Sequence, residues 1–174
     1  MILVVPHDPA WALQFAEEAQ QIHRALGAVV LDLHHIGSTA IQGIHAKPVI
    51  DMLLAVGDLQ VLDQQAGVLM ALGYEAKGEF GIPGRRYFSK DSPSGARSHQ
   101  LHAFQAGSHG FIRHLAFRDY MNAHPEVAQA YGRLKQQLAS QYPLNRTAYM
   151  DGKDPFIRQH EALAMDWFLQ QRAA

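Results

Sequence analysis

The spacing of apolar side chains predicts a helix near the start of the chain. Asp8 and Pro9 are residue types typical of an N-cap and a first helical turn. Gly27 then has the position of a residue that ends a helix. Between these signals, apolar residues recur three or four positions apart, at Trp11, Phe15, Ala19, Ile22 and Leu26. We therefore expect one face of this helix to be buried.

Strand-like sequence replaces the helical spacing after this helix. Residues 29–36 are β-rich, and residues 48–56 form an almost continuous apolar run. A run of this kind is typical of a strand that is covered on both faces. Apolar residues return to helical spacing from Leu59, and Gly73 has the position of a C-terminal cap. This region therefore predicts two strands and a second amphipathic helix.

A turn-rich segment, residues 91–95, separates two shorter β-rich stretches. These stretches are residues 85–90 and residues 97–104. Because Asp, Ser, Pro and Gly favour tight turns, the two stretches are predicted to form an antiparallel hairpin.

Helical spacing continues beyond the hairpin to the end of the chain, and Tyr131 fits helical packing in the core. Pro125 and Pro155 are each expected to begin a new helix, the second with Asp154 as its cap. The order helix, two strands, helix, hairpin and a helical C-terminal portion predicts an α/β (α+β) fold with a mixed sheet and flanking helices. Because no repeat or linker interrupts the chain, we expect a single domain over residues 1–174.

The composition excludes several classes of protein. Fifteen Lys and Arg residues against 16 Asp and Glu residues give a formal net charge of -1, so no overall basic field attracts a long nucleic acid. The absence of cysteine excludes disulfides, thiolate zinc sites and a cysteine nucleophile. No apolar run is long enough for a signal peptide or a membrane span. We expect a cytoplasmic protein with no membrane and no long nucleic-acid partner.

The candidate chemistry lies where the first predicted strand ends and the second begins. Gly37, Ser38 and Thr39 follow the first strand, and Lys47 and Asp51 lie at the start of the second. Glycine permits close approach to the backbone, and the amides and hydroxyls can donate to phosphate oxygens. Asp51 could supply oxygen to Mg²⁺ or Mn²⁺, with Lys47 balancing charge. These residues predict a small-molecule, phosphate-bearing ligand and a divalent cation.

This arrangement resembles the nucleotidyltransferase pattern, in which Gly-Ser is followed by two acidic residues at alternate positions of a strand. The position of the second acid is Leu53, so one expected metal ligand is missing. A structural alternative stays open, in which Gly37-Ser38 is only a tight turn and Asp51 forms a salt bridge with Arg97 or Lys47.

A longer series of residues resembles the GrpB family, in order along nearly the whole chain. The matching segments are Asp8-Pro9-Ala10-Trp11, His35-Ile36-Gly37-Ser38-Thr39-Ala40 with Gly43, Ala46-Lys47-Pro48-Val49-Ile50-Asp51, Arg85-Arg86-Tyr87-Phe88, Arg97-Ser98-His99-Gln100-Leu101-His102, Phe117-Arg118-Asp119-Tyr120 with His124-Pro125, and Tyr131, Leu134-Lys135, Tyr149 and Lys153. The resemblance implies a nucleotidyltransferase-like fold. Some relatives are fused to dephospho-coenzyme A kinase, which implies a link to nucleotide or coenzyme A metabolism.

Five further residues could complete the site. His35 and His102 lie on predicted strands next to the expected pocket. His35 could bind the metal, and His102 could act where the catalytic carboxylate is missing. Arg97, Arg118 and Lys135 could contact phosphate, a role that the family resemblance favours over ordinary surface charge.

Three functions stay open from the sequence. The first is nucleotidyl transfer with Asp51 on the metal ion. The second is a non-catalytic binding or regulatory module that lost its second carboxylate at Leu53. The third is a metal-dependent hydrolase that uses Asp51, His35 and His102. No P-loop, dinucleotide fingerprint or His-Glu-x-x-His motif is present, and the pattern fixes neither a substrate nor an oligomeric state.

Overall fold

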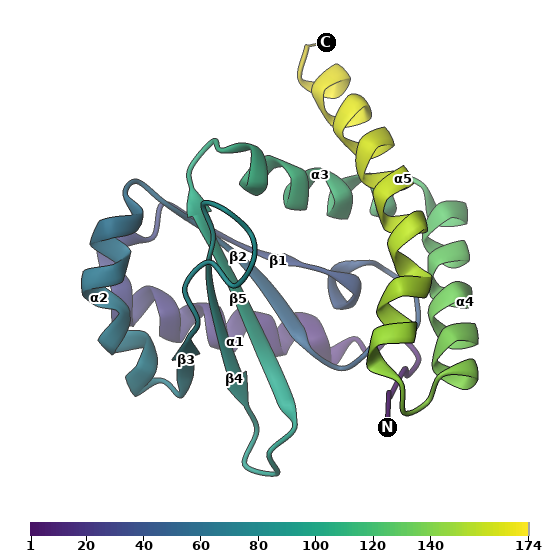
Figure 1. Ribbon diagram of the computed structural model, residues 1–174. Helices are drawn as coiled ribbons and strands as arrows, with labels where there is room; N and C mark the ends of the chain where they lie inside the picture. The colour runs from purple at the N-terminus through teal and green to yellow at the C-terminus, as the bar shows by residue number, and fades with distance from the viewer. Residues whose placement is uncertain (174) are drawn as a thin grey trace.

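Five strands form one mixed sheet in the computed structural model, which describes residues 1–173 (Figure 1). The strands are β1 (Asp32–Ile36), β2 (Ile50–Val56), β3 (Tyr74–Ala76), β4 (Arg86–Asp91) and β5 (Arg97–Gln105). Their order across the sheet is β1-β2-β5-β4-β3. β2 runs parallel to β5, and every other neighbouring pair is antiparallel. The mixed sheet and the hairpin of β4 and β5 are therefore confirmed.

Helices cover both faces of this sheet. They are α1 (Ala10–Leu26), α2 (Leu59–Ala71), α3 (His109–Ala123), α4 (Pro125–Gln141) and α5 (Arg146–Ala173). α1 and α2 pack on one face, α3 and α5 pack on the other, and α4 lies beside α5 (Figure 1). The α/β architecture with a helical C-terminal portion is thus confirmed. No helix within residues 1–173 is both long and apolar enough to cross a membrane.

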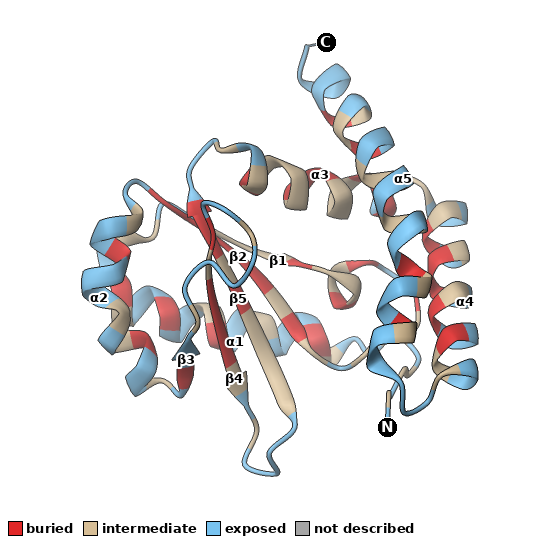
Figure 2. Cartoon of the chain, in the orientation of Figure 1, coloured by how far each residue is buried: buried red, intermediate tan, exposed pale blue. Residues whose placement is uncertain are grey.

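Both layers of the core meet on β2. Met52 and Leu54 pack against α1 and α2, whereas Leu53 and Ala55 pack against α3 and α5. These four side chains are at most 2% exposed, and Figure 2 colours much of β2 as buried. Burying one such aliphatic side chain stabilises the fold by about 1.5–3 kcal/mol. The one residue of β2 that is not buried is Asp51.

Side-chain caps and glycines place most helix ends where the sequence predicts them. The carboxylates of Asp8 and Asp58 each accept a hydrogen bond from the backbone amide two residues later, at 2.9 and 2.8 Å. Gly73 follows α2 with a φ of 102°, which favours glycine. α4 begins at Pro125, as expected.

The prediction that a new helix begins at Pro155 is wrong. α5 already begins at Arg146, and Pro155 lies inside it. Asn145 supplies the N-terminal signal, because its side-chain oxygen accepts a hydrogen bond from the amide of Ala148 at 3.0 Å. Pro155 removes one internal hydrogen bond, and packing against α3 and α4 offsets that loss. The earlier start matters because the first turns of α5 face the candidate site.

Gly152 in α5 and Gly67 in α2 provide a matched test of this helix packing. A Cβ on Gly152 would lie 2.5 Å from Cδ2 of buried Leu138 in α4, whereas a Cβ on Gly67 would meet nothing within 4 Å. We expect Gly67→Ala to raise the free energy of unfolding by about 0.5–1 kcal/mol, since alanine favours the helix. Gly152→Ala should lower it by about 1–2 kcal/mol through overpacking. Urea denaturation measures both, and stabilisation by both substitutions would contradict the packing of α4 on α5.

Candidate functional site

A left-handed glycine forms the corner after β1. Gly37 has a φ of 72°, and Ser38–Ala40 form a short 3-10 turn after it. A Cβ on Gly37 would lie 2.7 Å from Oδ2 of Asp51, which is closer than such atoms approach in real structures. Glycine is therefore required for the Asp51 carboxylate to pack against the corner. The structure thus brings Gly37, Ser38 and Asp51 side by side.

Asp51 forms a hydrogen bond with His102 and no salt bridge with Arg97 or Lys47. Nε2 of His102 lies 3.2 Å from Oδ1 of Asp51. Nδ1 of the same ring lies 3.3 Å from Nη1 of Arg85. Because a guanidinium group only donates, Nδ1 accepts and Nε2 carries the hydrogen that is donated to Asp51. His102 therefore orients Asp51, whose side chain stays 24% exposed.

Asp51 opens into a pocket of about 240 Å³ between β2, α4 and α5, which we call the lysine pocket. Its lining residues are Gly37, Ser38, Lys47, Val49, Asp51, Gln100, Tyr131, Lys135, Arg146, Tyr149, Met150 and Lys153. Four of them are basic and one is acidic. Within residues 1–173 none of the four basic side chains forms a salt bridge. The pocket therefore carries an excess of positive charge.

Lys135 and Lys153 are the buried basic residues of the pocket, at 2% and 8% exposure. Burial, aided by the charges of Lys153 and Lys47, lowers the pKa of Lys135 from 10.5 to about 7. Burial and the charge of Lys47 likewise lower the pKa of Lys153 to about 8. Nζ of Lys135 has no hydrogen-bond partner among residues 1–173. When charged, this amine needs acceptor oxygens that the described chain does not supply.

Two tyrosine rings lie against the lysine amines. Nζ of Lys153 lies 4.7 Å, and Nζ of Lys47 5.3 Å, from the ring centroid of Tyr149. Nζ of Lys135 lies 4.5 Å from that of Tyr131, which is buried as predicted but also lines the pocket. The hydroxyl of Tyr149 is buried without a partner in the described chain. Since burial raises the pKa of Tyr149 to about 12, this hydroxyl is a second free donor.

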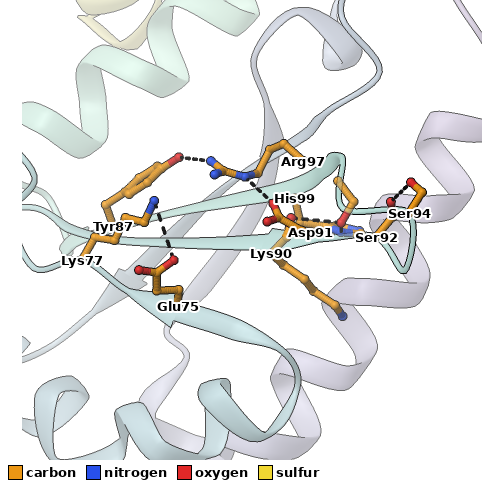
Figure 3. Close-up of polar contacts among 10 residues, drawn as sticks. Glu75, Lys77, Tyr87, Lys90, Asp91, Ser92, Ser94, Arg97 and His99 are labelled. Carbon is orange, nitrogen blue, oxygen red and sulfur yellow. Dashed lines mark hydrogen bonds and ion pairs between the residues drawn. The ribbon is translucent and has the colours of Figure 1, made fainter.

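A more apolar cleft of about 400 Å³, which we call the adjoining cleft, continues from the lysine pocket. The two share Lys47, Val49, Gln100, Arg146 and Tyr149. The adjoining cleft is also lined by Met1, Ile2, Leu3, Pro48, Ala96, Arg97, Pro143 and Leu144. Arg97 donates to Asp91 at 2.8 Å and to the hydroxyl of Tyr87 at 3.3 Å (Figure 3). The structure therefore places Arg97 at the adjoining cleft and not beside Asp51.

His35 lies on the other face of the sheet from Asp51. The register of β1 and β2 pairs Ile36 with Asp51, so the preceding side chain points to the opposite face. The ring of His35 stacks on Phe15 of α1 at 5.0 Å. Burial outweighs the opposing charge of Asp51 and lowers the pKa of His35 to about 4, which keeps the ring neutral. The structure does not bring His35 and Asp51 together as ligands of one cation.

Thr39 and Arg118 support the corner from outside the lysine pocket. Oγ1 of Thr39 donates to the carbonyl of Val49 at 3.3 Å and lies 2.8 Å from Nε2 of His35. Arg118 donates to the carbonyl of His35 at 3.2 Å and forms an ion pair with Asp119. Thr39 and Arg118 were both predicted to contact the ligand, and both instead form hydrogen bonds within the protein.

The donors around Asp51 do not fit a two-metal site. Leu53 occupies the second acidic position and is completely buried. Directly opposite Asp51, β5 presents the amide of Gln100. No group of three or more His, Cys, Asp or Glu side chains in the described part of the chain could hold a metal ion. A single Mg²⁺ or Mn²⁺ ion on Asp51 stays a prediction.

Sequence reasoning did not assign Arg146, Tyr149 and Lys153 to the site. They lie on α5 at positions i, i+3 and i+7, which share one face of a helix. Tyr149 and Lys153 belong to the family resemblance, so a signal was present. Because the sequence predicted that a helix begins at Pro155, these three residues were expected to precede the helix to which they belong.

Comparisons with known proteins identify relatives of this chain. The family model described as GrpB protein matches residues 1–162. UPF0157 protein YqkA of Bacillus subtilis is 41% identical over 164 residues, which cover 94% of this chain but 47% of that relative. The chain thus spans about half the length of YqkA. The crystal structure of conserved protein GrpB from Enterococcus faecalis is 40% identical, with a TM-score of 0.90 over 96% of this chain and 99% of that one.

Two more distant proteins are also similar to this chain, one in its fold and one, a longer enzyme, in its sequence. A mutant Cid1 poly(U) polymerase bound to MgATP has a TM-score of 0.55 at 13% identity, over 86% of this chain and 50% of that one. This likeness shows a nucleotidyltransferase fold and nothing beyond the fold. A dephospho-CoA kinase of Mycolicibacterium paratuberculosis is 27% identical over 189 residues, which cover 95% of this chain and 46% of that protein.

Lys135→Met is expected to stabilise the free protein, because methionine fills similar space without a buried amine. Between about pH 7 and pH 10.5 the unfolded chain holds a proton on Lys135 that the folded chain releases, so the free energy of unfolding rises with pH in this window. The gain from Lys135→Met should therefore be greatest at and below pH 7, about 2 kcal/mol, and should shrink at higher pH.

Urea denaturation over this pH range measures the effect. Arg133→Met is the matched control, since it removes one positive charge from an exposed position of the same helix. Equal stability of Lys135→Met and the wild type at every pH would contradict the burial of this amine.

Proposed function

The chain belongs to the GrpB family, and from this premise we propose that it binds a nucleotide, or a closely related ligand, through phosphate groups in the lysine pocket. The observation that carries the proposal is the buried amine of Lys135, which has no partner in the described chain. Anionic oxygens are the acceptors that suit such a group. Lys153 and the Gly37-Ser38 corner contribute further donors to the same pocket.

Phosphate suits the lysine pocket in both charge and hydrogen bonding. The four basic side chains outnumber the single carboxylate of Asp51. An opposite charge at about 4 Å contributes about 4 kcal/mol at an effective dielectric constant near 20. A diphosphate or triphosphate could engage several of these groups at once, with Ser38 and the adjacent amides donating to its oxygens.

The adjoining cleft favours a nucleotide over a free phosphate. It continues from the lysine pocket and offers Pro48, Pro143 and Leu144 as apolar walls for a base or another flat group. The dephospho-CoA kinase relative makes dephospho-coenzyme A a candidate beside the common nucleoside triphosphates. Such ligands occur in the cytoplasm, which is the location predicted from the sequence.

The residues around Asp51 favour a binding or regulatory role over nucleotidyl transfer. Leu53 lies at the place where a second carboxylate would hold metal ions for transfer, and β5 presents the amide of Gln100, not a carboxylate, opposite Asp51. Asp51, oriented by His102, could still accept a proton from an attacking hydroxyl, so transfer is the second candidate function. The hydrolase alternative lacks its ligand set, because His35 lies on the other face of the sheet.

Nucleotides are expected to raise the melting temperature of the protein. At a ligand concentration about 100 times the Kd, binding contributes about 2.7 kcal/mol, or roughly 5–10 °C for a chain of this size. Lys153→Met should lose about half of the shift or more, because it removes a buried donor from the pocket. The exposed control Arg133→Met should retain it. Differential scanning fluorimetry with nucleoside triphosphates and dephospho-coenzyme A measures the shift.

The same panel separates the candidate functions. A thermal shift without turnover supports the binding module. Release of pyrophosphate from a triphosphate, lost in Asp51→Asn, would support nucleotidyl transfer instead. No shift with any of these ligands would contradict the proposed function.

A further inference from the structure

The lysine pocket supplies positive charge from three separate segments of the chain. Lys47 comes from the loop before β2, Lys135 from α4, and Arg146 and Lys153 from α5. The one carboxylate among them, Asp51, already accepts a hydrogen bond from His102. A ligand in this pocket therefore meets four basic groups and one acidic group, all supplied by the protein.

Two buried donors in the same pocket have no acceptor in the described chain. They are Nζ of Lys135 and the hydroxyl of Tyr149. Buried polar groups without partners cost free energy in the free protein, so a fold that retains two of them in one pocket is arranged for a ligand that brings acceptors. The charged amine and the hydroxyl both donate, which matches the acceptor oxygens of a phosphate.

Apart from Asp51, the lysine pocket has no carboxylate within residues 1–173 that could hold a divalent cation. A two-metal site needs carboxylates that face the phosphates, and here Leu53 and Gln100 lie beside Asp51. Phosphate charge must nevertheless be neutralised when it leaves water. The lysine amines are the groups positioned to do so.

We propose that the lysine pocket binds the phosphate groups of its ligand without a divalent cation, with the amines of Lys47, Lys135 and Lys153 in the role that metal ions take in two-metal sites. This inference rests on the proposed function and deepens it, because it states how the phosphates are held. It sets this chain apart from metal-dependent nucleotide sites in a way that binding measurements can detect.

Protonation of the buried lysines accompanies such binding. In the free protein the pKa of Lys135 is lowered to about 7 and that of Lys153 to about 8, mainly by burial. A phosphate anion stabilises the charged amines and raises both pKa values, so the complex takes up protons above neutral pH. The charged and titratable groups around Lys135 are Lys47, Asp51, Tyr131, Arg146, Tyr149 and Lys153. Asp51 is the one among them whose charge favours the protonated amine, whereas the neighbouring positive charges oppose this uptake.

Calorimetric titration with ATP and with inorganic tripolyphosphate, in excess EDTA and in excess Mg²⁺, tests the inference. Mg²⁺ neutralises part of the ligand charge, so the affinity in EDTA should equal or exceed the affinity in Mg²⁺. Binding that occurs in Mg²⁺ and disappears in EDTA would overturn the inference and leave the proposed function intact. No binding of either probe under either condition would overturn the inference, and the proposed function fails with it if dephospho-coenzyme A does not bind either.

Substitution of Asp51 distinguishes the two modes of binding most sharply. Asp51→Asn removes the one negative charge of the pocket, so tripolyphosphate should bind equally or more tightly in EDTA. If a cation on Asp51 bridged the phosphates, the same variant would bind more weakly in Mg²⁺ by about tenfold or more, which would overturn the inference.

Lysine variants complete the test. Lys135→Met and Lys153→Met should each weaken binding in EDTA by about tenfold or more, whereas the exposed control Arg133→Met should bind as the wild type does. Titrations in buffers of different ionisation enthalpy should show uptake of roughly half a proton or more above neutral pH, reduced in Lys135→Met. Unchanged affinity in both lysine variants, with melting curves that confirm folding, would overturn the inference.

Discussion

A lysine amine buried without an acceptor is the constraint on which the interpretation of this protein depends. Burial removes water from Lys135 and Lys153 and moves the pKa of each toward neutrality, while the neighbouring positive charges act in the same direction. A protein selected for stability alone would place apolar side chains there. The retained amines support our proposal that stability is given up at this site for the binding of an anion.

The fold creates this site by bringing a strand corner against two helices. Gly37 lacks a side chain, and this lets Asp51 lie against the turn that also presents Ser38. α4 and α5 pack together and form the other side of the pocket. Lys135 lies on α4, and Lys153 lies on α5. Since β2 is buried on both faces, Asp51 is held at the end of a rigid strand.

Sequence patterns predicted the order of elements and the corner with Asp51, because capping residues, glycines and apolar periodicity act locally. These patterns could not predict the position of His35, because the face on which a strand residue lies depends on the register with the neighbouring strand. β1 pairs Ile36 with Asp51, so His35 lies on the opposite face. The role of Lys153 was missed because a proline usually begins a helix, whereas tertiary packing holds Pro155 inside α5. Local rules therefore located the corner with Asp51, and long-range packing decided the rest of the pocket.

The relatives place the chain in the GrpB family and its fold among the nucleotidyltransferases. Our proposal adds that the buried lysines of the pocket hold the phosphate groups of a ligand. The most direct measurement of that claim is the pKa of the Lys135 amine, followed by nuclear magnetic resonance in the free protein and with saturating tripolyphosphate in EDTA. The expected result is a pKa near 7 in the free protein that rises well above this value in the complex. A pKa that is the same with and without the bound phosphate would contradict the claim that this buried amine holds the ligand.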